Sequence, residues 1–197
     1  MEKQFSAVGQ GLMKVFFGVC LSAAYVLLNT TGLVLGLMPL RVLSAIMCLA
    51  VFFMVFVGLS ASSIVESGYW RAIWCARGSA VVGLLAALIM DNALLILLLA
   101  VVRQLMEIAG IAVVCRLSSR LMAERDGERD AGRGKWTWRL CTLCGCGGIL
   151  CAGVIFYIRN TKMMPALVLA YLVLQLLNRL IFMVFLYRSR GVLKEQR

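Results

Sequence analysis

Runs of about 20 apolar residues recur along this 197-residue chain, and they constrain its fold more than any other feature. A helix needs roughly 20 such residues to cross about 30 Å of hydrocarbon. No run alternates with the period of a barrel strand, so helices are the realistic spanning elements. Only 15% of the residues are charged, whereas soluble domains carry roughly 25%. The sequence therefore predicts an all-α integral membrane protein, a bundle of six transmembrane helices without a soluble domain.

The six predicted spans follow the apolar runs, and a basic loop separates the fourth from the fifth. The spans cover residues 12–37, 40–60, 69–90, 93–115, 140–158 and 165–187, and the loop covers residues 116–139. Asp91 and Asn92 interrupt the middle of the chain, and we interpret them as a tight turn because Asp and Asn bond their local backbone. The alternative is one span over residues 80–102, which gives five spans in all. An Asp at the bilayer centre costs at least about 2.5 kcal/mol, so the turn is preferred.

The distribution of Lys and Arg predicts the orientation. Cytoplasmic segments are enriched in basic residues. Six spans with both termini in the cytoplasm place the whole 116–139 loop inside and leave Arg41, Arg159 and Lys162 outside. Small size, short loops and the absence of processing signals favour a cell membrane of the bacterial inner-membrane type.

Composition also excludes several kinds of function. A net charge of +11 would indicate nucleic acid in a soluble protein, but here basic residues at helix ends are what topology requires. The chain has no His, which removes Ser-His and Cys-His catalysis, His-ligated metals and His proton relays. No Walker-type phosphate loop or GxSxG motif is present either. We expect no enzyme, cofactor or nucleic acid, and as partners the bilayer with another membrane protein or a second copy of the chain.

Polar side chains inside the fourth and sixth spans form the candidate site, since intramembrane charges are a functional hypothesis by default. Spacing of i, i+4 puts Arg103 and Glu107 on one helix face, and likewise Gln175 and Arg179. Counted from the outer ends at 1.5 Å per residue, Glu107 and Arg179 both lie about 21 Å deep. We therefore expect Glu107 to pair with Arg179, and Arg103 to lie beside Gln175. The candidates are Arg103, Glu107, Tyr171, Gln175, Asn178 and Arg179.

Two interpretations of this cluster remain open. Two arginines against one glutamate leave a surplus positive charge, which suits an anionic or carboxylate-bearing ligand or a water-filled cavity. Alternatively, the cluster only locks the bundle, because intramembrane polar contacts are often worth only about 0.6 kcal/mol.

A second group of residues, in the fifth span, permits a metal hypothesis. Thiolates bind soft metals such as zinc and Cu(I), but no second CxxC or His completes a set. On a helix, Cys141, Cys144, Gly148 and Cys151 would form a stripe of small residues that permits close helix packing, which we prefer. The weak metal candidates are Cys141, Cys144, Cys146 and Cys151.

Two functions therefore remain. The first is a non-enzymatic membrane module or accessory subunit that acts through helix–helix interactions. The second is a small transporter or substrate-binding subunit with a polar site between the fourth and sixth spans. Six helices in about 200 residues resemble, in architecture alone, the substrate-binding subunits of energy-coupling-factor vitamin transporters. The first span has no clear copy of their AxxxA docking motif, which limits what the resemblance implies to the second alternative.

Overall fold

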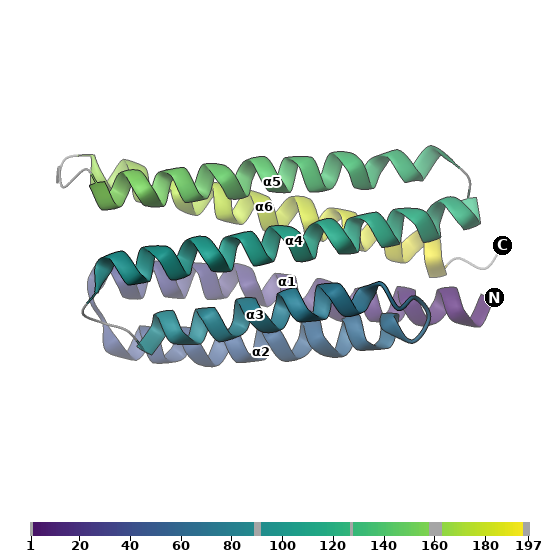
Figure 1. The fold of residues 1–197 in the computed structure, drawn as a ribbon, viewed down its shortest axis with the longest axis horizontal. Coiled ribbons are helices and arrows are strands. Elements are labelled where there is room, and N and C mark those ends of the chain that lie inside the picture. The colour runs from purple at the N-terminus through teal and green to yellow at the C-terminus, as the bar shows by residue number, and fades with distance from the viewer. Residues whose placement is uncertain (1, 89–91, 127, 158–162, 195–197) are drawn as a thin grey trace.

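A computed structural model describes residues 2–88, 92–126, 128–157 and 163–194, and the regular structure in this part of the chain is entirely α-helical. The helices are α1 (Glu2–Leu35), α2 (Met38–Ser63), α3 (Tyr69–Leu88), α4 (Ala93–Asp126), α5 (Glu128–Tyr157) and α6 (Met164–Lys194). They run up and down as one bundle, with the two termini at the same end (Figure 1).

The architecture is that of a multi-pass helical membrane protein. Five of the described helices are long and apolar enough to cross a membrane. The apolar segments are Phe5–Gly32, Met38–Ser63, Leu94–Glu124, Gly132–Tyr157 and Met164–Leu193. The remaining helix, α3, is not among these five; it has 20 residues and carries two arginines in its first half.

Helices that follow one another in the chain pack side by side, and α6 also packs against α1 and so closes the bundle. In addition α4 contacts α6 directly, while α5 packs against both. Five helices therefore surround the interior, namely α1, α2, α3, α4 and α6, and α5 covers the α4–α6 seam (Figure 1).

The turns between helices have local causes that the sequence contains. After α1, Gly36 adopts a positive φ of 64° and the Leu37 N–H bonds the Gly32 carbonyl at 3.2 Å, a Schellman ending. Pro39 then lies in the first turn of α2, where its missing N–H is not needed.

The break between α3 and α4 agrees with the predicted turn and contradicts a single helix over residues 80–102. Asn92 caps α4, because its Oδ1 accepts a hydrogen bond from the Leu95 N–H at 3.0 Å. Asp91 lies outside the described residues, as do Arg159 and Lys162.

The connector predicted at residues 116–139 was expected to be helical to about Arg125, which the structure confirms, whereas its second part, expected to be non-helical after the glycines, is helical as well. α4 continues to Asp126 and α5 begins at Glu128. The ion pair between Arg120 and Glu124, 3.1 Å at i, i+4 spacing, supports the extension of α4. Glycine at position 134 disfavours a helix by propensity but permits tight packing here, since a Cβ would collide with the Ser119 hydroxyl of α4.

The core is concentrated in the half of the bundle that holds the termini. α1 and α6 extend beyond the predicted spans into this half, and Val8 and Leu193 are fully buried there. The main apolar cluster joins these ends to α3 and to the C-terminal half of α4, with a smaller cluster at Tyr25, Val26 and Cys48 in the other half. The polar residues described next lie between the two clusters.

Candidate functional site: an ion cluster beside a central cavity

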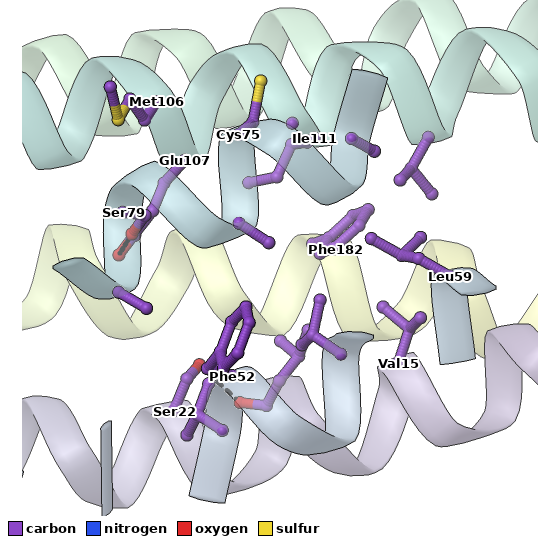
Figure 2. Close-up of a pocket in the computed structure, with 18 of the residues that line it drawn as sticks. Val15, Ser22, Phe52, Leu59, Cys75, Ser79, Met106, Glu107, Ile111 and Phe182 are labelled. Atoms are coloured by element: carbon purple, nitrogen blue, oxygen red, sulfur yellow. Dashed lines mark hydrogen bonds between the residues drawn. The ribbon is translucent and has the colours of Figure 1, made fainter. Parts of the chain in front are cut away.

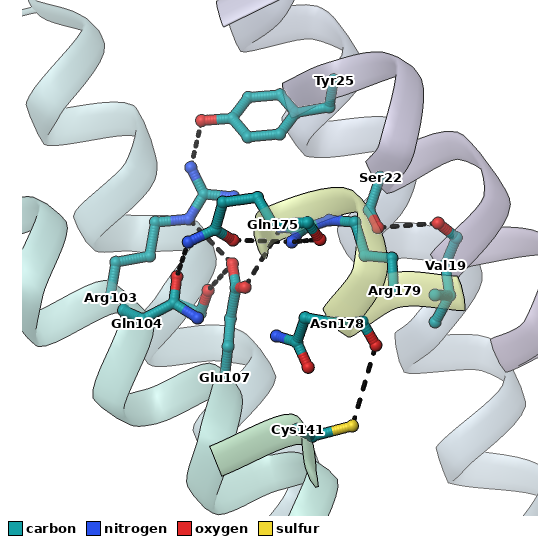
Figure 3. Close-up of polar contacts among 11 residues, drawn as sticks. Val19, Ser22, Tyr25, Arg103, Gln104, Glu107, Cys141, Gln175, Asn178 and Arg179 are labelled. Atoms are coloured by element: carbon teal, nitrogen blue, oxygen red, sulfur yellow. Dashed lines mark hydrogen bonds and ion pairs between the residues drawn. The ribbon is translucent and has the colours of Figure 1, made fainter. Parts of the chain in front are cut away.

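The predicted ion pair between α4 and α6 is present. Glu107 accepts a hydrogen bond from Arg179 Nη2 at 3.2 Å through one carboxylate oxygen. Its other oxygen accepts one from Arg103 Nε, one turn earlier on the same helix, at 3.1 Å. One carboxylate thus holds two guanidinium groups (Figure 3).

Two further helices reach this carboxylate and its arginines. Arg103 donates to the Tyr25 hydroxyl of α1, and its guanidinium lies over the Tyr25 ring, 4.3 Å from the ring centroid. Ser79 of α3 donates to Glu107 Oε1 at 3.4 Å. The cluster therefore connects α1, α3, α4 and α6. Neither Tyr25 nor Ser79 was a sequence-based candidate, because the lateral order of helices cannot be read from their apolar patterns.

The hydrogen bonds of the Gln175 side chain go to Gln104 and Arg179, not to Arg103, beside which it was predicted to lie. Gln175 Nε2 donates to Gln104 Oε1 at 3.0 Å, and its Oε1 accepts from Arg179 Nη1 at 2.8 Å. Successive helical residues are separated by about 100°, so Gln104 faces α6 where Arg103 turns toward α1. The signal for Gln104 was present, since it is an amide within an apolar span.

The other two candidates lie beside the cluster. Asn178 is 1% exposed, and its backbone carbonyl accepts a weak hydrogen bond from the Cys141 thiol of α5, 3.7 Å away. Tyr171, one turn outward from Gln175, borders a small cavity of about 20 Å³ between α4, α5 and α6. That volume holds about one water molecule.

A larger cavity of about 140 Å³ occupies the middle of the bundle, between all five helices that surround the interior. Most of its wall is apolar, and Phe52, Ile111 and Phe182 contribute large surfaces (Figure 2). The polar part of the wall consists of Ser22, Ser79, Arg103, Glu107 and Arg179. An apolar cavity of about 150 Å³ is large enough for benzene.

The hydrogen-bonding groups of the cluster are not all satisfied by the protein itself. Arg179 Nε and Gln104 Nε2 are buried and have no hydrogen-bond partner among the described residues. A buried donor left unpaired costs about 1–3 kcal/mol. In addition, 21% of the side-chain surface of Glu107 is solvent-accessible. The cluster is therefore a charged surface whose buried polar atoms are not all bonded within the described residues.

The cysteine-rich face of α5 packs closely against its neighbours. Cys141 and Cys144 are buried, whereas Cys146 is exposed. A Cβ at Gly148 would lie only 2.7 Å from Gln175 Nε2, so the small residue lets α6 approach. Within the described residues, no three His, Cys, Asp or Glu side chains are grouped closely enough to hold a metal ion.

No protein-family model matches the chain, and no curated protein or solved structure is significantly similar to it. None of these comparisons supports the resemblance to energy-coupling-factor subunits. Function is therefore inferred from the cluster and the cavity.

Proposed function

We propose that this chain is a non-enzymatic membrane module that binds a small, mostly apolar anion in its central cavity. The observation that carries the proposal is the charge at the cavity wall, where two arginines share the single carboxylate of Glu107. An uncompensated charge in a membrane interior is expensive. A ligand carboxylate would neutralise the surplus positive charge. Its two oxygens would accept paired hydrogen bonds from one guanidinium group.

The dimensions narrow the class of ligand. A cavity of about 140 Å³ accommodates one aromatic ring or a short branched chain, and its walls are mainly aliphatic and phenyl groups. An aromatic or branched monocarboxylate of about the size of benzoate matches both the walls and the charge. A sugar matches neither the walls nor the charge, and a nucleotide is too large and too polar for the cavity.

Topology belongs to the same proposal. We infer that α3 also crosses the membrane, because it lies alongside α2 and α4 in the bundle (Figure 1). With six crossings, both termini share one side. Described basic residues gather at that end of the bundle, which supports a cytoplasmic location; they include Arg116, Arg120, Arg133, Lys135, Arg139, Arg188 and Arg190. The cavity would then lie within the bilayer, as a substrate-binding or transport subunit requires.

A thermal-unfolding comparison of three compounds of similar size and different charge tests the binding proposal. Benzoate should raise the melting temperature of the purified chain, because a ligand at 100 times its Kd stabilises by about 2.7 kcal/mol. Benzyl alcohol should do so less and benzylamine not at all. If benzyl alcohol equals benzoate, or if none of the three stabilises the protein, the proposal fails.

The Arg179→Gln variant tests whether the binding of benzoate depends on the ion cluster. It leaves the Arg103–Glu107 pair, which is neutral overall, so the preference for benzoate over benzyl alcohol should disappear. Arg116→Gln is the matched control, since it removes an exposed arginine from α4 away from the cavity. That variant should retain the preference.

An accessory subunit that acts through helix–helix contacts is the second candidate. Such a subunit would use the mode of contact found within the chain, where α1 and α2 approach so closely that a Cβ on Gly58 would lie 2.6 Å from the Gly11 carbonyl. For such a module, none of the three compounds should alter the melting temperature.

A further inference from the structure

Side chains, rather than close backbone contacts, span the seam between α2 and α3 beside the central cavity. The guanidinium carbon of Arg77, on α3, lies 5.3 Å from the ring centroid of Phe56, on α2. The Phe56 ring packs against Phe52, with 5.7 Å between the ring centroids, and Phe52 lines the cavity (Figure 2). We propose, on the premise of the proposed function, that Arg77 and Phe56 form a gate through which the ligand enters sideways from the membrane.

The other seams around the cavity are closed by tight helix packing or by a further helix. Between α1 and α2, a Cβ on Gly58 would lie 2.6 Å from the Gly11 carbonyl. Between α3 and α4, a Cβ on Gly78 would lie 2.5 Å from the Met106 sulfur. α6 packs against α1, and α5 covers the α4–α6 seam. A passage at any of these seams would require whole helices to separate.

α2 and α3 approach each other on either side of the gate. Toward the end of the bundle away from the termini, a Cβ on Gly83 would lie 3.2 Å from the Cys48 sulfur. At the other end, the turn over residues 64–68 joins the two helices. The α3 residues that line the cavity between these points all have small side chains: Ala72, Cys75, Ala76, Ser79 and Ala80. Rotation of the Phe56 and Arg77 side chains would therefore open the seam without a movement of either helix.

The gate lies near the level expected for lipid headgroups. Trp70, Trp74 and Arg77 share one face of α3 by their i, i+4 and i+7 spacing. The two tryptophans are 45% and 63% exposed, and tryptophan favours the headgroup level because its ring is apolar and its N–H is polar. An aromatic carboxylate accumulates at the same level, since its charge stays hydrated while its ring enters the apolar region. Sideways entry thus begins where such a ligand collects.

The rates of benzoate binding to the full chain in lipid vesicles test the gate. Phe56 is not part of the cavity wall, so Phe56→Leu should raise the association and dissociation rate constants alike, by about tenfold, and leave the Kd unchanged. Arg77→Met keeps an apolar stem and loses the cation–π contact, which should raise both rate constants by about fivefold. The matched controls are Phe53→Leu, at a 64% exposed position of α2, and Arg71→Met, at an exposed position of α3. Both controls should leave the rates unchanged.

A labelling experiment tests the gate separately from benzoate binding. In a background without native cysteines, Ser79→Cys places a thiol in the cavity wall. An uncharged benzyl thiosulfonate should modify that thiol about tenfold faster in combination with Phe56→Leu than with Phe53→Leu. Faster labelling without any binding of benzoate would support the gate and contradict the proposed function.

Two results would overturn the gate. The first is an equal labelling rate with Phe56→Leu and Phe53→Leu. The second is a change in the Kd of benzoate in the Phe56→Leu variant while the association rate constant stays the same, because Phe56 would then belong to the binding site and not to the entry route.

Discussion

Glu107 on α4 and Arg179 on α6 form an ion pair of 3.2 Å across 72 positions of sequence. The same carboxylate also bonds Arg103, so its removal would release two arginines at once. This sharing determines how the bundle should respond to changes in the cluster.

Glu107→Gln should destabilise the protein more than Arg179→Gln. The first change leaves two buried cations without a counter-charge, and removal of one partner from a buried pair costs about 3–5 kcal/mol. The second leaves a neutral pair and should cost about 1 kcal/mol. Unfolding in detergent or by steric trapping measures both, and the reverse order would show that Glu107 does not hold both arginines.

Exchanging the charges of Glu107 and Arg179 tests whether their ion pair is independent of Arg103. Glu107→Arg combined with Arg179→Glu should recover part, not all, of the expression lost in each single variant. Recovery is incomplete because an arginine at position 107 lies at i, i+4 from Arg103, and like charges at that spacing repel. The measurement is the level of each variant in the membrane fraction. A double variant that is expressed at a lower level than both single variants would contradict the pairing.

Tyr25 should contribute to the cluster through both its ring and its hydroxyl. Tyr25→Phe removes the bond from Arg103 but keeps the ring below the guanidinium, so we expect a loss of about 1 kcal/mol in stability. Tyr25→Leu removes the cation–π contact too, and should cost about 1–2 kcal/mol more. Equal losses in the two variants would mean that the ring contributes nothing.

The α1–α2 contact depends on the absence of side chains. Gly58→Ala places a Cβ 2.6 Å from the Gly11 carbonyl and 2.8 Å from Val15 Cγ2, both in a packed interface. Overpacking of this kind costs about 1–3 kcal/mol. Gly153→Ala in α5 meets nothing within 4 Å, so it should be neutral or gain up to about 1 kcal/mol from helix propensity. Melting temperatures of the two variants should differ accordingly.

The depth of a residue along its helix could be predicted from the sequence, whereas the neighbouring helix that its side chain faces could be predicted only in part. The Glu107–Arg179 pair was predicted by counting residues inward from the outer ends of the fourth and sixth spans. In the structure these helices begin at Ala93 and Met164, close to the predicted starts at residues 93 and 165. The hydrogen-bond partners of Arg103 and Gln175 could not be predicted, because each helix has several neighbours, and Arg103 bonds Tyr25 of α1.

The cavity and the helical hairpin of α4 and α5 were beyond prediction for another reason. Both depend on how helices meet. Five helices enclose the cavity, and the sequence of any one helix gives no sign that the cavity exists. At the α4–α5 hairpin, packing of Gly134 against Ser119 outweighs a local composition that favours a loop.

The most direct test of the central claim is whether the cavity wall can be reached by a water-soluble anion. In a background without native cysteines, Ser79→Cys places a thiol beside Glu107 in the cavity wall, whereas Ser118→Cys places one in a fully buried contact with Tyr69. A negatively charged thiosulfonate should label position 79 faster than a positively charged one, benzoate should slow that labelling, and position 118 should stay unlabelled. If position 79 proves as unreactive as position 118, the cluster is a dry lock between helices and not a binding site.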